Sequence, residues 1–275
     1  MDQKYSVLMS LYYKEKSEYL TKSIDSMLEQ TVKPDEIIIV KDGELTQELE
    51  DILSIYHRKF SSLIKLVPLE TNVGLGKALD IGLNYCSNQL VARMDTDDIS
   101  LPERCEKQLK MFQENSELSI VGAMIDEFYE KPSNVVSSRV VPTSHKDIVA
   151  FIKRRSPFNH PTVMFKKDAV ISSGGYGNLR RKQDLDLFSR MINKGHKAAN
   201  IDESLLLFRS NEDNFKRRKS WSYCKSYIDV QYTIWRRGHC SLIDLMVVTS
   251  GQLFMFVAPM WMLKYFSSKY LRQQK

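Results

Sequence analysis

The stretch LVARMDTDDISLPER, residues 90–104, sets an alternating apolar run directly against Asp95, Asp97 and Asp98. In α/β sheets, ligands bind at the carboxyl ends of parallel strands, so the residues that follow a strand carry functional information. Two interpretations fit three carboxylates at such a place. They cap the helix that follows, where aspartate is favoured, or they bind a divalent cation, which prefers hard oxygen ligands. Their place after a buried strand favours the cation, although Asp-x-Asp alone is a weakly specific motif.

Similar β-rich runs recur along the chain, at residues 5–13, 36–42, 63–69 and 90–95, with helical patterns such as 18–30 between them. This alternation predicts an α/β fold with a mostly parallel central sheet covered by helices on both faces. The letters IIIV of the second run are all apolar, as expected of a strand that is covered on both sides.

Further elements follow the aspartates. We expect a helix over 101–115 with Pro102 in its first turn, a strand over 118–130, a helix over 145–155, a strand over 159–167 and a helix that starts at Gln183. Gly74, Gly174 and Gly175 are expected to serve backbone turns that glycine adopts easily.

The charge of the chain is uneven. Residues 1–210 hold 29 Lys and Arg against 30 Asp and Glu, whereas residues 211–275 hold 11 against 4. The sequence therefore predicts a nearly neutral α/β domain at 1–210 and a basic, apolar helical segment at 211–275 for membrane association. An anionic surface such as phospholipid head groups is the expected partner of the tail, and no nucleic acid is expected.

Four cysteines, Cys86, Cys105, Cys224 and Cys240, are scattered without metal-ligand spacing. We expect them to be small core or interface residues. The chain opens without a charged region followed by an apolar signal core, so a cytoplasmic protein is predicted.

Taken together, six segments resemble the family 2 glycosyltransferases, which are inverting nucleotide-sugar enzymes with a GT-A fold. They are YSVLMSLYYKEKSEYLTKSIDSMLEQT (5–31), IIIVKDG (37–43), NVGLGKALDIGL (72–83), ARMDTDDISLPER (92–104), NHPTVMFKKDAVISSGGY (159–176) and QDLDLFSRMINKGH (183–196). The resemblance runs from about residue 5 to about residue 210. It is strongest to bacterial enzymes that extend lipid-linked O-antigen or exopolysaccharide repeat units of the amylovoran type.

The resemblance implies a metal and a base. Asp97, with Asp95 and Asp98, would hold Mn²⁺ or Mg²⁺ at the diphosphate of a nucleotide-sugar. Asp184 would be the general base that takes the proton of the acceptor hydroxyl. A helix N-cap is the structural alternative for Asp184, since aspartate is common at that position.

The resemblance also places the nucleotide. Uridine contacts would fall on Ser10, Tyr12 and Asp42, Lys77 would approach the phosphates, and Asp95 would bind the nucleotide at its diphosphate. For Lys77, a solvated position on a helix is an equal alternative.

Two motifs depart from the family pattern. The second-strand loop is usually Asp-Asp-Gly-Ser, but here it reads Lys41-Asp42-Gly43-Glu44. The base motif is usually Glu-Asp, but here it reads Gln183-Asp184. Both departures keep the aspartate to which the resemblance assigns a role.

Three neighbouring side chains have two interpretations each. His160 lines the acceptor side or is a histidine satisfied within the protein. Arg180 and Arg181 contact a diphosphate or are ordinary exposed loop arginines.

The implied reaction moves a hexose, with a lean towards galactose, from a UDP-sugar to a saccharide acceptor, which we expect to be a lipid-diphosphate-linked sugar. One alternative is a sugar-1-phosphate nucleotidyltransferase, although the first strand lacks the glycine-rich loop of that class. Another is a non-catalytic, membrane-binding relative.

The tail combines Lys and Arg clusters with Trp221, Trp235 and Trp261, and residues 245–263 form a 19-residue run without charge. Attachment to the inner face of the bacterial plasma membrane is the first expectation, because this composition is typical of helices at the head-group layer. A re-entrant or spanning helix is the second. Docking onto the enzyme's own domain or onto the partner of a homodimer is the third.

Overall fold

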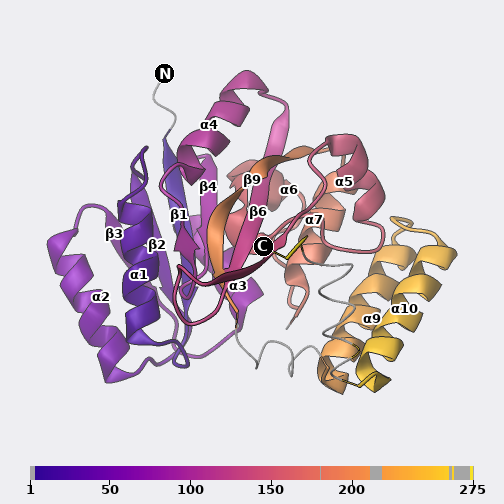
Figure 1. The fold of residues 1–275 in the computed structure, drawn as a ribbon. Helices are drawn as coiled ribbons and strands as arrows, with labels where there is room; N and C mark the ends of the chain where they lie inside the picture. Colours follow the sequence, from indigo (N-terminus) through magenta and orange to yellow (C-terminus); the bar gives the residue numbers. More distant parts are fainter. Residues whose placement is uncertain (1–3, 180, 211–218, 260–261, 263–272, 275) are drawn as a thin grey trace.

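The computed structural model describes residues 4–179, 181–210, 219–259, 262 and 273–274. In this part of the chain, helices cover both faces of one ten-stranded sheet (Figure 1). The strands are β1 (Tyr5–Leu11), β2 (Glu36–Lys41), β3 (Ile64–Pro68), β4 (Leu90–Met94), β5 (Ile99–Ser100), β6 (Leu118–Phe128), β7 (Val135–Arg139), β8 (Met164–Lys166), β9 (Lys197–Arg209) and β10 (Gln273–Gln274). The helices are α1 (Ser17–Leu28), α2 (Gln47–Lys59), α3 (Leu75–Tyr85), α4 (Arg104–Glu114), α5 (His145–Phe151), α6 (Lys167–Ser172), α7 (Gln183–Asn193), α9 (Trp221–Arg236) and α10 (Leu242–Val257), with a 3₁₀ turn, η1, at His160–Thr162.

The sheet is mixed. Its order is β10-β7-β6-β8-β4-β1-β2-β3, with β9 beside β6 and β5 beside β9. The pairs β1–β2, β1–β4 and β2–β3 are parallel, as the first strand–helix repeats predict. Beyond β4 the pattern changes, because β8 inserts antiparallel between β4 and β6 and β7 is antiparallel to β6. Parallel pairing therefore joins β1–β4, and it recurs between β6 and β9, whereas the strands between and around them pair antiparallel.

Two predicted boundaries differ from the structure. Helix α4 starts at Arg104, so Pro102 lies in the turn before the helix and not in its first turn. The carbonyl of Pro102 accepts the backbone N–H of Thr31 at 2.9 Å, which ties this turn to the end of α1. The strand predicted over 159–167 is only three residues long, because His160–Thr162 form a 3₁₀ turn with a proline at its start.

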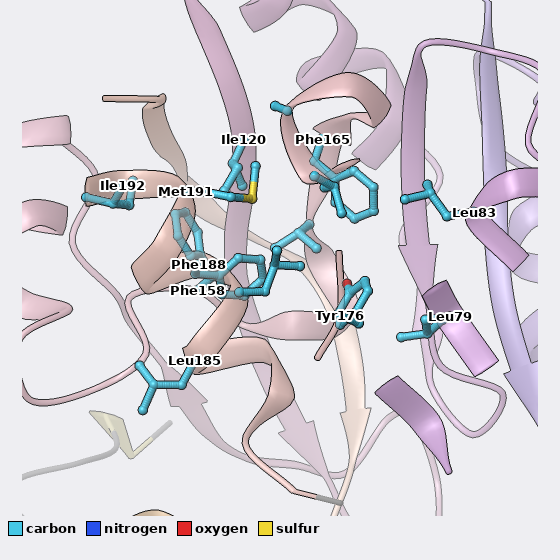
Figure 2. Packing of buried hydrophobic residues seen from close by; sticks show 14 of the residues in the cluster. Leu79, Leu83, Ile120, Phe158, Phe165, Tyr176, Leu185, Phe188, Met191 and Ile192 are labelled. Carbon is cyan, nitrogen blue, oxygen red and sulfur yellow. The ribbon is translucent and has the colours of Figure 1, made fainter. Parts of the chain in front are cut away.

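Alternation along the strands divides the core between the two faces. Val7 and Met9 of β1 pack with α1, α2 and α4 on one face. Leu8 of β1 packs on the other face with α3, α6, α7 and α9. Figure 2 shows part of the second core, where Tyr176 lies between Leu79 of α3 and the aromatic side chains near α7.

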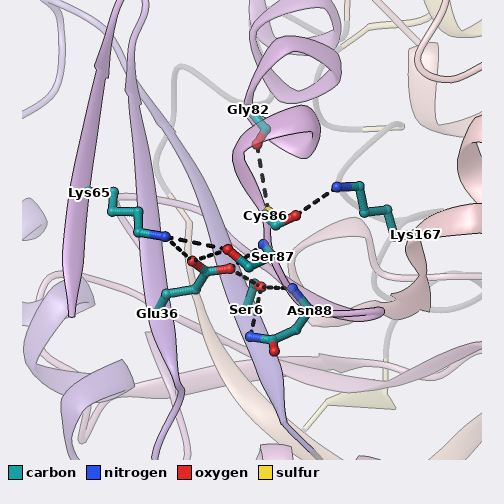
Figure 3. Close-up of polar contacts among 8 residues, drawn as sticks. All are labelled: Ser6, Glu36, Lys65, Gly82, Cys86, Ser87, Asn88 and Lys167. Atoms are coloured by element: carbon teal, nitrogen blue, oxygen red, sulfur yellow. Dashed lines mark hydrogen bonds and ion pairs between the residues drawn. The ribbon is translucent and has the colours of Figure 1, made fainter. Parts of the chain in front are cut away.

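The amino ends of the parallel strands are held by a buried carboxylate (Figure 3). Glu36 of β2 accepts hydrogen bonds from Ser6 of β1 and Lys65 of β3, both at 2.6 Å, and from the backbone and hydroxyl of Ser87 before β4. Burial raises the pKa of Glu36, but these donors outweigh it and lower the value to about 2. One side chain therefore connects the parallel strands β1, β2 and β3 with the residues before β4, at the end opposite the predicted site.

The two C-terminal helices lie side by side at the edge of the molecule (Figure 1). Tyr227, Val230 and Ile234 of α9 belong to the same core as α7, and α10 packs against α9. A capping box of Ser241 and Asp244 starts α10. Asp244 also accepts Nε of Arg154 at 2.6 Å, which ties α10 to the segment after α5.

The outer side of α10 is apolar and exposed. Leu242, Ile243, Met246, Val247, Phe254 and Val257, here called the α10 apolar face, are 48–76% exposed. Across the described part of the chain, no helix has both the length and the hydropathy that crossing a bilayer requires. The boundary predicted at residue 210 stays a prediction, and residues 211–218, 260–261 and 263 of the tail lie outside the described residues.

Candidate active site

Three carboxylates gather at the end of β4, as the sequence predicts. Ligand oxygens of Asp95, Asp97 and Asp98 all lie within 4.8 Å of one another. Asp98 is fully buried, and its Oδ1 accepts the backbone N–H of Arg209 at 2.9 Å. Its Oδ2 is buried without a hydrogen-bond partner among the described residues. A buried carboxylate oxygen of this kind needs a donor or a cation, because leaving it unpaired is costly.

The charges at this place repel one another. Burial, together with the negative charges of Asp95 and Glu15, raises the pKa of Asp97 to about 7. Burial and the two neighbouring aspartates raise the pKa of Asp98 well above its ordinary value. Crowded carboxylates that supply only hard oxygen atoms fit Mg²⁺ or Mn²⁺, which relieves the repulsion between them when bound.

Asp95 has a built-in counter-ion. Arg93 of β4 is 1% exposed, and its guanidinium forms a two-point pair with the Asp95 carboxylate, one bond of which, Nη1 to Oδ2, is 2.6 Å. The carbonyl of Asp95 accepts the hydroxyl of Ser23 from α1 at 2.6 Å. Thr96 donates to Glu15 at 2.8 Å, so the loop after β1 is tied to the loop after β4. The ends of two neighbouring parallel strands thus meet, at the edge of the sheet where ligands of α/β proteins bind.

Arg209, the last residue of β9, holds the aspartate loop from the other side. Its Nε donates to the carbonyl of Asp97 at 2.9 Å, and its backbone N–H donates to Asp98. The guanidinium lies 3.7 Å from the ring centre of Tyr19 and 4.7 Å from that of Phe128. Stacked between two rings, Arg209 is a rigid support for the loop.

Asp42 lies at the end of β2 and is 2% exposed. Its Oδ1 accepts the backbone N–H of Val73 at 2.7 Å, and its Oδ2 accepts Gly74 N–H at 3.1 Å and the Asn72 amide at 3.0 Å. These bonds use three of roughly four acceptor positions of a carboxylate. Asp42 therefore shapes the loop that leads into α3, and its predicted contact with uracil stays a prediction.

The other predicted nucleotide contacts surround this loop. Ser10 is partly buried near the end of β1, and Tyr12, just beyond it, is 42% exposed. Lys77 is exposed in the first turn of α3. The three positive φ angles expected at Gly74, Gly174 and Gly175 are confirmed.

Asp184 is the second residue of α7, and α7 starts against α3. A Cβ atom on Gly76 would lie 2.9 Å from Cγ and 3.0 Å from Cβ of Gln183, so only glycine permits this approach. The contact brings the start of α7, with the predicted base, next to the turn that carries Lys77. Asp184 is partly buried and lies within the first turn of α7, where the helix dipole favours its negative charge.

Tyr176 is buried beside His160. Burial raises the pKa of Tyr176; Arg93 opposes this, and the negative charges of Asp184 and Asp95 add to it. The Tyr176 hydroxyl lies 2.8 Å from Nε2 of His160, whose ring also packs on Phe188. His160 is thus satisfied by Tyr176 within the protein.

The cysteines and the two loop arginines are also singled out from the sequence. All four cysteines are buried and free, as expected of core residues. Arg181 is partly buried, and Arg180 lies outside the described residues.

Three side chains of the site escaped the sequence reasoning: Arg93, Tyr176 and Arg209. For Arg93 a signal existed, because an arginine within an apolar strand, two residues before Asp95, must lie on the same side of the strand as that aspartate. For Arg209 none existed, since it reaches Asp97 and Asp98 from β9 only through the pairing of β9 with β5 and β6.

Comparisons with known proteins agree with this geometry. A family model described as Glycosyl transferase family 2 matches residues 6–182. The amylovoran biosynthesis glycosyltransferase AmsE of Erwinia amylovora is 40% identical over 228 residues, covering 82% of this chain and 84% of that protein. The UDP-Gal:alpha-D-GlcNAc-diphosphoundecaprenol beta-1,3-galactosyltransferase of Escherichia coli is 35% identical over 270 residues, covering 98% of this chain and 97% of that protein.

A solved structure shows the same fold. The mannosyltransferase PcManGT of Pyrobaculum calidifontis, in complex with GDP-Man and Mn²⁺, superposes with a TM-score of 0.66 at 13% identity, covering 95% of this chain and 72% of that one. The expected GT-A fold is thereby confirmed. The family model and the two relatives, which are glycosyltransferases, overturn the alternative of a nucleotidyltransferase. Because the family model covers more than half of the chain, this protein is a glycosyltransferase that belongs to glycosyl transferase family 2.

Proposed function

We propose that the enzyme transfers a hexose, galactose in the first instance, from a UDP-sugar to a lipid-diphosphate-linked saccharide, with inversion at the anomeric carbon and with Mn²⁺ or Mg²⁺. The observation that carries the proposal is the cluster of Asp95, Asp97 and Asp98 at the end of β4, whose ligand oxygens lie within 4.8 Å of one another. Asp184, at the start of α7, is the second acidic group of the proposal. One group suits a cation at a diphosphate and the other suits a proton acceptor.

Each group has a separate task in such a transfer. Asp95, Asp97 and Asp98 would hold the divalent cation, which when bound neutralises charge on the leaving diphosphate. Asp184 accepts the proton of the acceptor hydroxyl as that oxygen attacks the anomeric carbon. Attack on the face opposite the leaving group inverts the configuration, by the same geometric logic that applies in inverting glycosidases. Arg93 and Arg209 keep the acidic loop in place and take no part in the proton transfer.

The names of two relatives support the choice of substrates. The E. coli relative is named for UDP-Gal as donor and for a GlcNAc-diphosphoundecaprenol acceptor, and its match spans nearly the whole chain. The Erwinia relative is named for amylovoran biosynthesis. Polysaccharide assembly on a lipid carrier is accordingly the proposed setting.

A lipid-linked acceptor requires the enzyme to work at a membrane, and the α10 apolar face suits that task. Exposed residues of this kind recur at helical spacing along α10, from Leu242 to Val257. A contiguous exposed apolar surface of this kind marks an interaction site. The tail also carries 11 Lys and Arg against 4 Asp and Glu, which favours the anionic inner face of the plasma membrane.

The proposal is tested with purified full-length protein, a GlcNAc-diphosphate-lipid analogue and Mn²⁺. Donors are UDP-galactose, UDP-glucose, UDP-GlcNAc, GDP-mannose and a dTDP-sugar, each assayed with and without chelator. We expect transfer from UDP-galactose, loss of activity with chelator, and a β linkage in the product by NMR. An α-linked product, or undiminished activity in chelator, would overturn the inverting or the metal-dependent part respectively. Transfer from one of the other donors alone would replace galactose in the proposal with the sugar of that donor.

A further inference from the structure

Lys182 precedes the proposed base by two residues and has an unusual backbone. It is the N-cap of α7, with φ 61° and ψ 20°, which is the left-handed region. Residues with a side chain rarely occupy that region, because Cβ approaches the following carbonyl. The carbonyl of Lys182 nevertheless accepts the N–H of Asp186 at 3.1 Å and so forms the first turn of α7. The direction in which Gln183 and Asp184 leave the loop therefore depends on this strained residue.

The C-terminal helix α9 holds Lys182 in place. The ammonium group donates to the hydroxyl of Tyr223 at 2.5 Å. It also lies 4.5 Å from the ring centre of Tyr223 and 4.4 Å from that of Tyr227. Burial lowers the pKa of Lys182, but the two tyrosines and Asp184 outweigh this and raise it, so the group stays charged. A cation between two rings with a hydrogen bond is a specific anchor.

A second contact joins the same elements further along α7. Asp186 accepts Nη1 of Arg237, just after α9, at 2.5 Å, and Nε of Arg190 at 3.0 Å. Ser189 lies 3.1 Å from Nδ1 of His239. Helix α7 is thus attached to the C-terminal helices both at its start and in its middle.

We propose that Tyr223 and Tyr227 are positioning residues for Asp184, which act by holding Lys182 in the left-handed conformation that starts α7. This inference rests on the proposed role of Asp184 as the base. It gives helix α9 of the tail a role in positioning the base, beside the proposed membrane attachment. It also explains why a lysine can stand where a glycine would be the easier choice.

The test compares Lys182→Ala with Lys182→Gly, in full-length protein with a short soluble acceptor. Alanine loses the anchor and keeps the backbone strain, whereas glycine adopts the left-handed conformation freely. We expect Lys182→Ala to lower kcat by about 10- to 100-fold, the range expected when a reacting group is misplaced. The KM of the donor and the affinity for UDP with Mn²⁺ should not change. Lys182→Gly should recover most of the lost kcat.

The tyrosines are tested by a double-mutant cycle. Tyr223→Leu combined with Tyr227→Leu should lower kcat like Lys182→Ala, and should have little further effect in the Lys182→Gly background. Tyr232→Leu is the matched control, since Tyr232 is on the same helix and 47% exposed. Circular dichroism checks folding. If the leucine variants do not fold, the two Lys182 variants decide, because neither alters α9.

The outcomes separate this inference from the proposed function. Wild-type kcat in Lys182→Ala, alongside a severe loss in Asp184→Asn, overturns the inference and leaves the base in place. Equal losses of kcat in Lys182→Ala and Lys182→Gly would show that the left-handed backbone of Lys182 does not position Asp184, and would overturn the inference. A wild-type kcat in Asp184→Asn would refute the assignment of Asp184 as the base. The inference, which rests on that assignment, would be refuted as well.

Discussion

A single residue separates Asp95 from Asp97, but the two carboxylates have different surroundings. Arg93 pairs with Asp95 and offsets its charge. Burial and the charges of Asp95 and Glu15 act on Asp97 and raise its pKa to about 7. A cation therefore relieves more unfavourable free energy at Asp97 than at Asp95, which makes Asp97 the sharper test of the metal assignment.

We expect Asp97→Asn to lower transfer by at least about 100-fold, the order seen when one electrostatic stabiliser of a transition state is removed. Binding of UDP in the presence of Mn²⁺, measured by calorimetry, should weaken as well. Asp202→Asn is the control, because Asp202 is exposed on β9. Wild-type activity of Asp97→Asn, with and without chelator, would refute the metal site.

Asp184→Asn should separate binding from chemistry. The amide keeps the size of the side chain and loses the proton acceptor, so kcat should fall by roughly 10²–10⁴-fold while UDP affinity stays the same. Rapid-quench kinetics and calorimetry measure the two quantities. A parallel loss of UDP affinity and of thermal stability would point instead to a helix-capping role.

At the scale of elements, the approach of α7 to α3 decides where the base lies. Gly76 is the contact point, since a Cβ there would meet Cβ and Cγ of Gln183. We expect Gly76→Ala to displace the start of α7 and to lower kcat by about tenfold or more, because small misplacements of reacting groups are costly. Gly251→Ala on α10 is the matched control, since its Cβ would meet open space. Equal kcat in the two variants would show that α7 does not need this close approach.

The opposite end of the sheet depends on Glu36 (Figure 3). Its pKa is lowered to about 2 in the folded protein, from an ordinary value of 4.5. The carboxylate therefore stabilises the fold above about pH 4.5, and this contribution is lost as the pH falls through the folded pKa. Glu36→Gln should reduce the free energy of unfolding by roughly 1–3 kcal/mol at pH 7, because buried donors lose a charged partner.

Denaturant titrations of wild type and Glu36→Gln from pH 7 down to pH 2 measure this difference. It should shrink as the pH approaches 2, where the wild-type carboxyl is also protonated. Glu48→Gln, on the exposed side of α2, should show no such trend. A difference independent of pH would mean that packing at Glu36, and not its charge, stabilises the strands.

At the scale of the whole molecule, the C-terminal helices have one buried and one exposed face. The inner face contributes Tyr227, Val230 and Ile234 of α9 to the core. A truncation before α9 would expose these side chains, so it would confuse membrane binding with folding. Substitutions on the α10 apolar face avoid this problem, because that face is exposed.

We expect Met246→Glu combined with Val247→Glu to weaken co-sedimentation with anionic vesicles by about tenfold or more, since each side chain inserted in the membrane contributes on the order of 1.5 kcal/mol. Binding of the wild type should weaken only partly in high salt, because screening affects Lys and Arg but not apolar insertion. Activity should fall on long-chain lipid acceptors and persist on short soluble ones. Ile55→Glu, a change of the same kind on α2, is the control. Unchanged sedimentation of the α10 variant would refute the membrane role of this face.

The sequence by itself determined the elements that depend on local order. The repeat of strand and helix, the aspartates at the end of β4 and the glycines with positive φ all follow from neighbouring residues, whose periodicity and backbone freedom act over a few positions. For the same reason the family resemblance could be read from short motifs and assigned Asp97 and Asp184 to tasks before their distance was known.

Only the tertiary structure decided which distant residues support those tasks. Arg209 reaches the aspartate loop from β9, Tyr176 hydrogen-bonds to His160, and two tyrosines of α9 hold Lys182. The antiparallel insertion of β8 and the burial of the inner face of α9 were likewise decided only by the tertiary structure. None of these contacts leaves a local pattern in the sequence, because each depends on how separate elements pack. Side-chain contacts between segments far apart in the chain are set by the folded core and not by neighbouring residues.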